Sequence, residues 1–498
     1  MRILLINPKI PQTFWSFKNA LKFIAKKSSE PPLGLLTVAA MLPAEWQLRL
    51  IDLNVTVLKD KHIEWADWVF ITGMHVQKTS FIEVVRRCNQ LGVPVIAGGA
   101  MCTLEPEKIK GVAHFVLGEA ENILPVFLKD LLHGSAKKIY QTDIFPDLTT
   151  CPVPRWDLLS MNKYASMSIQ YSRGCPYHCD FCSITTLNGH KPRTKEKEQF
   201  ISELQSLYNS GWRGSVFLVD DNFIGNKRKL KEEILPAMIR WSVEHHYPFQ
   251  FLTEASLNLA DDDTLMRLMV QAGFDAAFIG IETPNEESLS ECGKKQNLRG
   301  NLLESVKKLH SRGLAVSGGF IVGFDHDPYS IFEKQIAFIQ ESGIVTAMVG
   351  LLNAMPGTKL FKRLHAENRI IKETSGDNMD CTLNFRPKMN YQKLIDGYRM
   401  ILQTIYSHNA FYSRLKLFLN EYQLPDTSSL KINFQKIMAL IKSVWILGIR
   451  EKGRLYYWDL IFYSLFKQPK KFSLAVTYAI YGFHFRKVVD SINYQMKV

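Results

Sequence analysis

The first 140 residues alternate short apolar runs with stretches in which apolar residues recur every three to four positions. The short runs predict buried strands, and the longer periodic stretches predict amphipathic helices. Strands are expected at Arg2–Asn7, Gln47–Asp52, Trp68–Thr72, Pro94–Ala97 and His114–Leu117, and helices at Leu33–Leu42 and Lys78–Leu91. Because strands and helices alternate, the pattern predicts a doubly wound, Rossmann-like α/β domain over residues 1–140.

A stretch rich in Pro and Thr, Phe145–Pro154, interrupts this pattern and is interpreted as part of a linker over residues 141–165. A second series of strands and helices occupies residues 166–385. Its strands are expected at Met167–Tyr171, Ser215–Val219, Phe249–Glu254, Ala277–Glu282, Val316–Val322 and Ala347–Leu352. Six consecutive βα units predict a partial or complete barrel of the TIM type, and we expect the partial (β/α)6 form.

After Pro387 the pattern becomes helical and aromatic, without a convincing strand. Helices are expected at Ile437–Ile449, Leu455–Phe466 and Phe472–Phe485. The chain is therefore expected to end in a helical domain over residues 386–498, which completes an α/β architecture of three parts.

The positive charge of the chain is concentrated in that last segment. Residues 386–498 hold 18 of the 61 basic side chains but only 6 of the 48 acidic ones. Charge confined to one end does not suit a protein that coats nucleic acid, so we expect no nucleic-acid partner. Trp and Tyr beside Lys and Arg are typical of helices that lie on anionic lipid, which makes peripheral membrane contact one hypothesis. The alternatives are a helical lid packed on the barrel and a groove that binds tRNA.

The cysteines indicate a metal site. We expect no leader, because the strand-like run Arg2–Asn7 follows Met1 directly. We also expect no membrane-spanning helix, because no apolar stretch reaches the roughly 18–20 residues that span a bilayer. Three of the eight cysteines, Cys175, Cys179 and Cys182, are clustered, which in such a chain indicates a metal site in a reducing cytoplasm. The scattered ones are interpreted as small buried hydrophobic residues: Cys88, Cys102, Cys151, Cys292 and Cys381.

The clustered cysteines follow the first strand of the predicted barrel, on the face where barrel active sites lie. Three thiolates on one loop can bind three irons of a cubane and leave the fourth open, whereas a structural zinc site needs a fourth ligand. With Phe181 before the last cysteine, this loop resembles that of the radical SAM superfamily. The resemblance implies that the three cysteines are catalytic ligands of a 4Fe–4S cluster and that Phe181 belongs to the cofactor site. It further implies that the open iron binds S-adenosylmethionine, from which reduction releases a 5′-deoxyadenosyl radical.

The same resemblance suggests roles for residues at the ends of the later strands. It implies contacts of Asp220, Asp221 and Asn222 with the methionine amino group, of Glu254 and Glu282 with the ribose hydroxyls, of Lys294 with the methionine carboxylate, and of the backbone around Gly323 with the adenine. Structural alternatives stay open for these positions. Asp220 and Asp221 could cap a helix, and Lys294 could be an ordinary solvated lysine. The strand that ends at Gly323 could serve packing alone.

Glycines and acidic residues at the strand ends of the first domain resemble the cobalamin-binding domain of cobalamin-dependent radical SAM enzymes. The residues expected to bind cobalamin are Gly34, Asp52, His75, Gly98, Gly99, Gly118 and Glu119. Glycine lets a large ligand approach the backbone. Many cobalamin domains carry a cobalt-binding histidine after the first strand, but residues 7–13 contain none. His75 is the nearby candidate for that role, for contact with the corrin edge, or for a purely structural role.

The order of the three parts resembles the group that includes the hopanoid methylases. This implies methylation of an unactivated carbon of an apolar, lipid- or hopanoid-like substrate, through the 5′-deoxyadenosyl radical and methylcobalamin. It also implies an electron donor such as flavodoxin or ferredoxin, and a place in the cytoplasm or at the inner face of the membrane. One alternative is a cobalamin-binding radical SAM enzyme that catalyses cyclisation or rearrangement without methyl transfer. Another is a cobalamin sensor or carrier without enzymatic activity.

Overall fold

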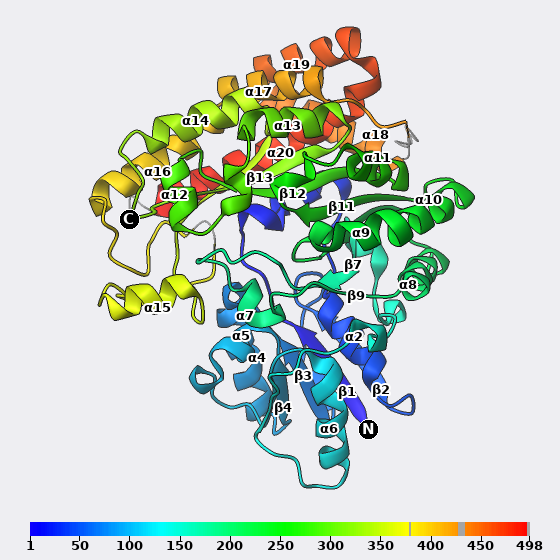
Figure 1. Ribbon diagram of the computed structural model, residues 1–498. Helices are drawn as coiled ribbons and strands as arrows, with labels where there is room; N and C mark the ends of the chain where they lie inside the picture. The colour runs from blue at the N-terminus through cyan, green and yellow to red at the C-terminus, as the bar shows by residue number, and fades with distance from the viewer. Residues whose placement is uncertain (378–379, 427–433, 496–498) are drawn as a thin grey trace.

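The computed structural model describes residues 1–377, 380–426 and 434–495. The amino-terminal part is built on six parallel strands in the order β2-β1-β3-β4-β5-β6 (Figure 1). The strands are β1 (Arg2–Asn7), β2 (Gln47–Asp52), β3 (Trp68–Thr72), β4 (Val95–Gly98), β5 (His114–Val116) and β6 (Ile139–Tyr140). The first five lie close to the predicted positions. The short edge strand β6 was not predicted, because two residues carry no periodic signal.

Helices cover both faces of this sheet, as the pattern predicts. They are α2 (Leu33–Met41), α3 (Asp60–Glu64), α4 (Lys78–Gln90), α5 (Ala100–Leu104) and α6 (Ala120–Leu132). Leu4 and Ile6 of β1 share one apolar core with α4, whereas Ile3 and Leu5 share the other with α2 and α6. Alternate residues of one strand thus point to opposite faces, and both faces are buried. The doubly wound prediction is confirmed.

The second sheet has six parallel strands in the order β14-β13-β12-β11-β10-β7, so neighbours in space follow one another along the chain. They are β7 (Met167–Ile169), β10 (Gly214–Leu218), β11 (Phe249–Ala255), β12 (Phe274–Glu282), β13 (Ala315–Val322) and β14 (Thr346–Leu351). β7 and β14 form the two edges and do not pair, so the barrel is partial, as expected. β7 ends two residues earlier than predicted, because the Tyr171 amide donates to an Asp220 oxygen.

Helices surround the outer face of this partial barrel. The longer ones are α8 (Lys197–Asn209), α10 (Leu235–Glu244), α11 (Asp263–Ala272), α13 (Leu302–Ser311) and α14 (Ile331–Ser342). The short helices of this part are α7 (Ile184–Asn188), α9 (Lys227–Lys229), α12 (Glu286–Glu291) and α15 (Lys359–Ala366), of which α7 and α15 lie toward the first domain (Figure 1). The strands β8 (Ser172–Arg173) and β9 (Arg193–Thr194) form a separate antiparallel pair. Along β11 the outward residues are fully buried, whereas Leu252 and Glu254 face the barrel interior and are half-buried.

The carboxyl-terminal part is helical, as predicted. Its helices are α16 (Tyr391–Ile405), α17 (His408–Glu421), α18 (Phe434–Ser443), α19 (Arg454–Lys467) and α20 (Phe472–Gln495). The helix expected at Ile437–Ile449 is instead α18 continued by a π-helical segment, Val444–Arg450. Within the described ranges, none of the helices is both long and apolar enough to cross a bilayer.

The segment that follows β1 leaves its own domain, which the sequence did not reveal. In Figure 1 this blue segment, including α1 (Lys18–Leu21), lies among the green strands and red α20. The Phe14 ring stacks on Phe485 at 4.2 Å between centroids, and His484 Nε2 lies 2.8 Å from the Phe14 carbonyl oxygen. Trp15 meets Phe278 of β12 edge to face at 5.3 Å. The two ends of the chain therefore join the first domain to the barrel.

The parts are also joined through the segment between β6 and β7. This segment contains only three short 3₁₀ turns, and the Tyr164 hydroxyl near its end donates to Asp52 Oδ2 at 2.9 Å. The domain limits at residues 140, 165 and 385 stay predictions. Of the scattered cysteines, Cys88, Cys102, Cys151 and Cys292 are buried as expected. Cys381 is only half-buried, so the interpretation as a buried residue was wrong there.

Candidate functional site

The three clustered cysteines lie on the loop that leaves β8 at the carboxyl end of β7. All three are half-buried, whereas Pro176 and His178 between them are exposed. Gly174 precedes the loop with a φ of 96°, and a Cβ there would lie 2.8 Å from the Lys191 carbonyl oxygen. Only glycine fits this position without strain. The loop therefore leaves the strand through a turn that its sequence dictates.

Two aspartates after β10 hold this loop in place. Asp220 accepts hydrogen bonds from the amides of Tyr171 (2.9 Å) and Ser172 (2.7 Å). Asp221 accepts one from the Gly174 amide at 2.7 Å and two from the Asn188 side chain. Neither carboxylate caps a helix, so that alternative was wrong. Both bind the backbone just before Cys175, which makes them positioning residues for the cysteine loop.

Burial changes the protonation of these groups. Desolvation raises the pKa of Asp220 to about 7, although three hydrogen bonds from Tyr171 and Ser172 oppose the change. Burial likewise raises the pKa of the thiols of Cys175 and Cys179, and that of Cys182 to about 12. The free thiols are therefore neutral at pH 7, and a bound metal must displace their protons.

Lys294 and Glu282 form a buried ion pair beside the loop. Lys294 Nζ lies 2.5 Å from Glu282 Oε1, and both residues are buried. Burial alone would lower the pKa of Lys294, but Glu282 and the nearby Cys179 outweigh it, so the pKa is raised. Gly280 lies beneath the pair, since a Cβ there would be 2.3 Å from Glu282 Oε1. The alternative of an ordinary solvated lysine was therefore wrong, while the predicted contact with the methionine carboxylate stays a prediction.

The donor set around the loop suits an iron–sulfur cluster. Gln296 Nε2 lies 4.0 Å from Cys179 Sγ, while Gln296 Oε1 is buried with no hydrogen-bond partner. Over the described residues, no three His, Cys, Asp or Glu side chains converge on a point that could hold one metal ion. In a cubane each thiolate binds a different iron, so the sulfurs need not converge. Three half-buried thiols with one open side therefore fit a three-ligand cluster.

Two carboxyl groups, one from the barrel and one from the first domain, have raised pKa values and interact electrostatically. Burial raises the pKa of Glu254 to about 8, helped by the negative charges of Asp221 and Glu30. Burial also raises the pKa of Glu30 to about 7. Glu30 precedes α2 in the first domain and was missed, because a single acidic residue before two prolines carries no motif. The two residues bring a carboxyl group from each domain into one region.

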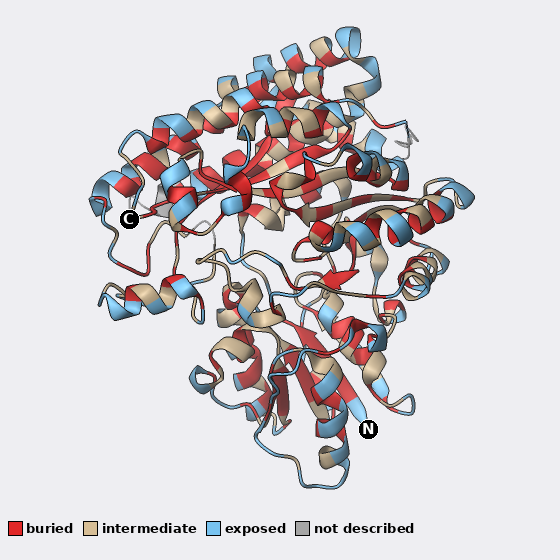
Figure 2. Cartoon of the chain, viewed as in Figure 1, coloured by how far each residue is buried: buried red, intermediate tan, exposed pale blue. Residues whose placement is uncertain are grey.

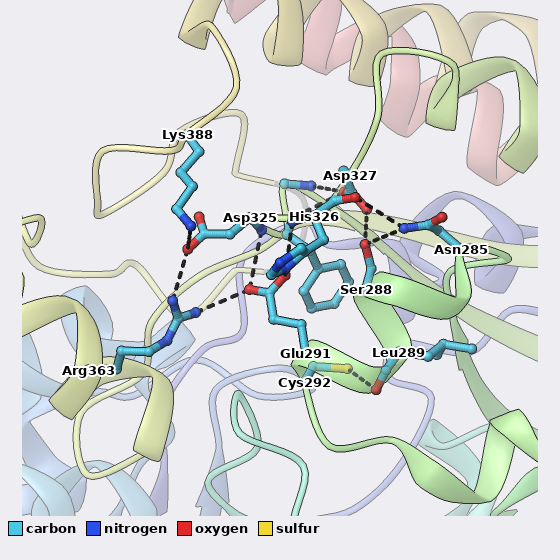
Figure 3. A network of polar contacts seen from close by, with 12 residues as sticks. Asn285, Ser288, Leu289, Glu291, Cys292, Asp325, His326, Asp327, Arg363 and Lys388 are labelled. Carbon is cyan, nitrogen blue, oxygen red and sulfur yellow. Dashed lines mark hydrogen bonds and ion pairs between the residues drawn. The ribbon is translucent and has the colours of Figure 1, made fainter.

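The loop after β13 is held by the polar network of Figure 3. Asp327 Oδ2 accepts the amide of Gly323 at 2.8 Å, and Asp327 Oδ1 accepts the Ser288 hydroxyl at 2.7 Å. Glu291 of α12 binds Arg363, which also contacts Asp325. The network fixes the backbone at Gly323, whose φ is 108°. Phe181 meets Phe324 edge to face at 6.1 Å, so this loop adjoins the cysteine loop.

Asn222, which follows the two aspartates after β10, has a protein partner of its own. Its side-chain amide donates to the Ser256 hydroxyl oxygen at 3.2 Å.

The glycines predicted to admit cobalamin fall into two classes. Gly34 is exposed with nothing within 4 Å of a built Cβ, and exposed Gly118 has only Ile123 at 3.9 Å. A Cβ on Gly98 would instead meet the Val116 carbonyl oxygen at 2.8 Å, and one on Gly99 would meet Thr72 Oγ1 at 2.3 Å. Packing within the domain explains the second class. The space beside Gly34 and Gly118 suits an approaching ligand.

Two other predicted cobalamin residues, Asp52 and His75, have protein partners. Asp52 binds Asn7, Asn54 and Tyr164. His75 Nε2 lies 3.0 Å from Glu105 Oε2, and both side chains are buried, which favours the structural role of this histidine. A cobalamin contact of these residues stays a prediction.

Glu119 joins the strand ends of the first domain to the cysteine loop. Arg193 of β9 binds both of its oxygens, at 2.5 and 3.0 Å, and Arg173 of β8 binds it at 2.7 Å. Arg173 also binds Glu121 at 2.8 Å. Arg173 lies two residues before Cys175, so this ion-pair network sets the position of the loop relative to the first domain.

Replacing Glu119 by Gln should weaken this connection. The substitution removes the charge that holds Arg193 by two bonds, so we expect the free energy of unfolding to fall by about 1.5–3 kcal/mol. Urea titration of the full chain measures it. Glu198→Gln breaks an exposed pair with Lys197 and serves as the control, with no measurable change. Equal effects of the two substitutions would contradict a structural role of Glu119.

Family models match most of the chain. A B12 binding domain matches residues 24–128, the radical SAM superfamily matches 169–339, and a domain of unknown function (DUF4070) matches 358–497. The matched ranges follow the amino-terminal sheet, the partial barrel and the carboxyl-terminal helices described above.

Curated relatives extend over nearly the full length. An uncharacterised methyltransferase of Synechocystis sp. is 40% identical over 97% of this chain and 91% of its own. The hopanoid C-2 methylase of Rhodopseudomonas palustris is 32% identical over 92% of this chain and 88% of its own. The bacteriochlorophyllide d C-12(1)-methyltransferase of Chlorobaculum tepidum is 24% identical over 77% of this chain and 84% of its own.

Two solved structures share the fold at low sequence identity. The radical S-adenosylmethionine methyltransferase TsrM of Kitasatospora setae, solved with cobalamin and a [4Fe-4S] cluster, has a TM-score of 0.58 at 15% identity and covers 75% of this chain and 79% of its own. The cobalamin-dependent radical enzyme OxsB, solved with aqua-cobalamin and S-adenosylmethionine, has a TM-score of 0.63 at 14% identity and covers 100% of this chain and 80% of its own.

Proposed function

Because this chain belongs to the family of cobalamin-dependent radical SAM methyltransferases, we propose that it transfers a methyl group to an unactivated carbon of an apolar small molecule. The observation that carries the proposal is the Glu119 network. It connects the strand ends of the cobalamin-type domain to the loop of Cys175, so that groups bound at the two faces would share one space.

Different residues of the chain would have different roles within this space. Cys175, Cys179 and Cys182 would bind the cluster, while Asp220 and Asp221 hold their loop rigid through backbone hydrogen bonds. When bound, the cluster with S-adenosylmethionine supplies radical chemistry and cobalamin supplies methyl transfer, neither of which side chains can perform. The remaining predicted contacts are proposals: Asn222 with the methionine amino group, Glu254 and Glu282 with the ribose, Lys294 with the methionine carboxylate, the backbone at Gly323 with the adenine, and Gly34 and Gly118 with cobalamin.

The barrel interior supports an apolar substrate. Leu252, Ala276 and Phe278 are inward-facing and half-buried, and Trp15 from the first domain meets Phe278 there. Apolar and aromatic walls with few polar groups favour a largely apolar ligand. The carboxyl groups of Glu254 and Glu30, both with raised pKa values, supply the polar groups of this region.

The proposal also includes an electron donor of the flavodoxin or ferredoxin type. The outer side of the cysteine loop presents exposed His178, whose ring lies 4.0 Å from that of exposed His190, with exposed Lys359 nearby. The positive charge of Lys359 at the rim of the loop suits the acidic surface of a small electron carrier. We place the reaction in the reducing cytoplasm, where such carriers work, with a contact at the inner membrane surface that would suit an apolar substrate.

The experiment uses the full chain, reconstituted anaerobically with iron, sulfide and cobalamin. It is incubated with S-adenosylmethionine, a reductant and a total lipid extract of cells that lack the gene. We expect S-adenosylhomocysteine and 5′-deoxyadenosine to form together, and one lipid to gain a CH₂ unit. The Cys182→Ala variant, treated in the same way, controls for products that do not need the cluster.

Two outcomes would contradict parts of the proposal. Formation of 5′-deoxyadenosine without S-adenosylhomocysteine would exclude methyl transfer and favour the cyclisation or rearrangement alternative. A methylated product confined to soluble metabolites, with an unchanged lipid profile, would retain methyl transfer and exclude the apolar substrate.

A further inference from the structure

Large apolar side chains are exposed in a row along α18 and the π-helical segment after it. The row consists of Phe434, Ile437, Ile441, Trp445 and Ile449, each exposed, with Phe434 at 77%. Their spacing of three or four residues places them on one side of a continuous helix. The opposite side of the helix packs against the rest of the protein, since Ala439 and Leu447 belong to the main core.

A second exposed row runs along α19. It consists of exposed Leu455, Phe462 and Phe466 (Leu455 77% and Phe466 76% exposed) and of half-buried Trp458, again spaced by three or four residues. The rings of Trp458, Phe462 and Phe466 stack in order, at 5.8 and 6.4 Å between centroids. Tyr457, Leu460 and Ile461 on the opposite side are buried. In Figure 2 the exposed side of α19 forms the pale blue upper border of the molecule.

The two rows belong to one rigid unit. Trp458 Nε1 donates to the Gly448 carbonyl oxygen at 3.0 Å, and a Cβ on Gly448 would lie 3.2 Å from the Trp458 ring. The Ser443 and Tyr457 hydroxyls lie 2.8 Å apart in the buried contact beneath. The apolar rows therefore keep a fixed relation to each other, and we call them the α18–α19 face.

Basic side chains are concentrated in the segment that carries the α18–α19 face. The segment 434–471 holds eight of them, Lys436, Lys442, Arg450, Lys452, Arg454, Lys467, Lys470 and Lys471, against two acidic ones, Glu451 and Asp459. Both acidic residues are already paired, with Lys487 and Lys416. The Arg450 guanidinium lies 5.8 Å from the Trp445 ring centroid. The segment that carries the face is thus strongly positive, although Lys442 and Lys471 donate to the carbonyl oxygens of Lys22 and Leu419.

We propose that the α18–α19 face docks on the surface of an anionic lipid bilayer. Exposed apolar patches of this extent mark interaction sites. Trp and Phe on one side of a helix with Lys and Arg at its borders match a helix whose apolar side enters the headgroup region, where the cations meet lipid phosphates. A second copy of the chain would bring a like positive rim against this one, which disfavours self-association. The face lies apart from the proposed reaction site, and its test does not depend on turnover.

The test measures binding of the full chain to vesicles by co-sedimentation. We expect binding to vesicles of phosphatidylcholine with phosphatidylglycerol, and at least about tenfold weaker binding to phosphatidylcholine alone, since each basic residue near an anionic surface contributes about fivefold. Raising the salt concentration should weaken the binding. Equal binding to both kinds of vesicle would overturn the electrostatic part of the proposal.

The first variant replaces Phe462 and Phe466 by Asp. Because both rings are exposed, the fold should persist, as thermal unfolding will show, while vesicle binding should fall at least about tenfold. The matched control, Val57→Asp with Ile144→Asp, makes the same change of charge at side chains that are 75% and 73% exposed in the first domain. Equal binding of the Phe462→Asp, Phe466→Asp variant and the wild type would overturn the proposal.

The second variant, Lys452→Glu with Arg454→Glu, leaves the apolar rows intact. It should lower binding to anionic vesicles and leave binding to neutral ones unchanged, whereas the control Lys110→Glu with Lys129→Glu should have little effect. Equal losses in this variant and its control would show that only net charge matters, which would overturn the assignment of the face. A dimer of the wild type that dissociates in the Phe variant, without vesicle binding by either, would identify a second copy as the occupant instead.

Discussion

Replacing Cys179 by Ala should abolish turnover and leave the purified chain without its full complement of iron, and the same is expected for Cys175 and Cys182. The three thiols are the ligands we propose for the cluster, and a cluster held at three corners cannot lose one without losing its coordination. The substitution is small and the residue is half-buried, so the fold should persist. Iron and sulfide content after anaerobic reconstitution measures the effect directly, with about four irons per chain in the wild type.

The control for this experiment is Cys381→Ala. Cys381 is half-buried like the three loop cysteines, and burial raises the pKa of its thiol to about 12, as it does for Cys182. It lies outside the loop, so iron content and turnover should match the wild type. Full iron content in a Cys179→Ala preparation would refute the ligand assignment, and it would leave the sensor or carrier hypothesis standing.

Replacing Lys294 by Met should lower the free energy of unfolding by about 3–5 kcal/mol. The substitution leaves the Glu282 carboxylate buried beside Cys179 with no counter-charge. The backbone of Glu282 is already strained, with a φ of 66°, which disfavours a rearrangement that would expose the carboxylate. Removing one member of a buried ion pair costs more than the pair contributes, because the remaining charge is desolvated and unpaired. Urea titration of the full chain measures the change.

A double substitution distinguishes destabilisation by the unpaired Glu282 charge from destabilisation by lost packing. Glu282→Gln combined with Lys294→Met removes both charges, so the double variant should be more stable than Lys294→Met alone. The matched control is Lys295→Met, one residue away but exposed, which should behave as the wild type. A double variant as unstable as Lys294→Met would show that the unpaired charge is not the cause.

Local patterns were sufficient for most of the fold. Strands such as β1 and β11 are runs whose burial is visible in their own residues, and helices such as α4 show their periodicity directly. The spacing of Cys175, Cys179 and Cys182 after a strand likewise pointed to a cluster, since the three ligands lie within one loop. The boundaries failed where a side chain from elsewhere intervenes, as at Tyr171, whose amide is taken by Asp220 from a strand 49 residues away.

The roles of the predicted site residues depended on contacts between distant segments. Asp220 and Asp221 were expected to contact the methionine amino group or to cap a helix; they cap no helix but accept hydrogen bonds from the backbone before Cys175, and a ligand contact stays a prediction. Lys294 is buried against Glu282, although nothing in its neighbours along the chain distinguishes it from a solvated lysine. Glu30 has no motif at all, and only its electrostatic interaction with Glu254 marks it.

The charge and aromatic content of residues 386–498 were plain from composition, but composition cannot say which side chains a core covers. Leu455 and Tyr457 lie two residues apart in the chain, yet Tyr457 is buried and Leu455 joins the exposed row on α19. Strand and helix type follow from interactions between residues a few positions apart, which the sequence displays. Burial, ion pairing and the meeting of residues 14 and 485 follow from packing across the whole chain, where many arrangements share the same local pattern and only the folded molecule selects one.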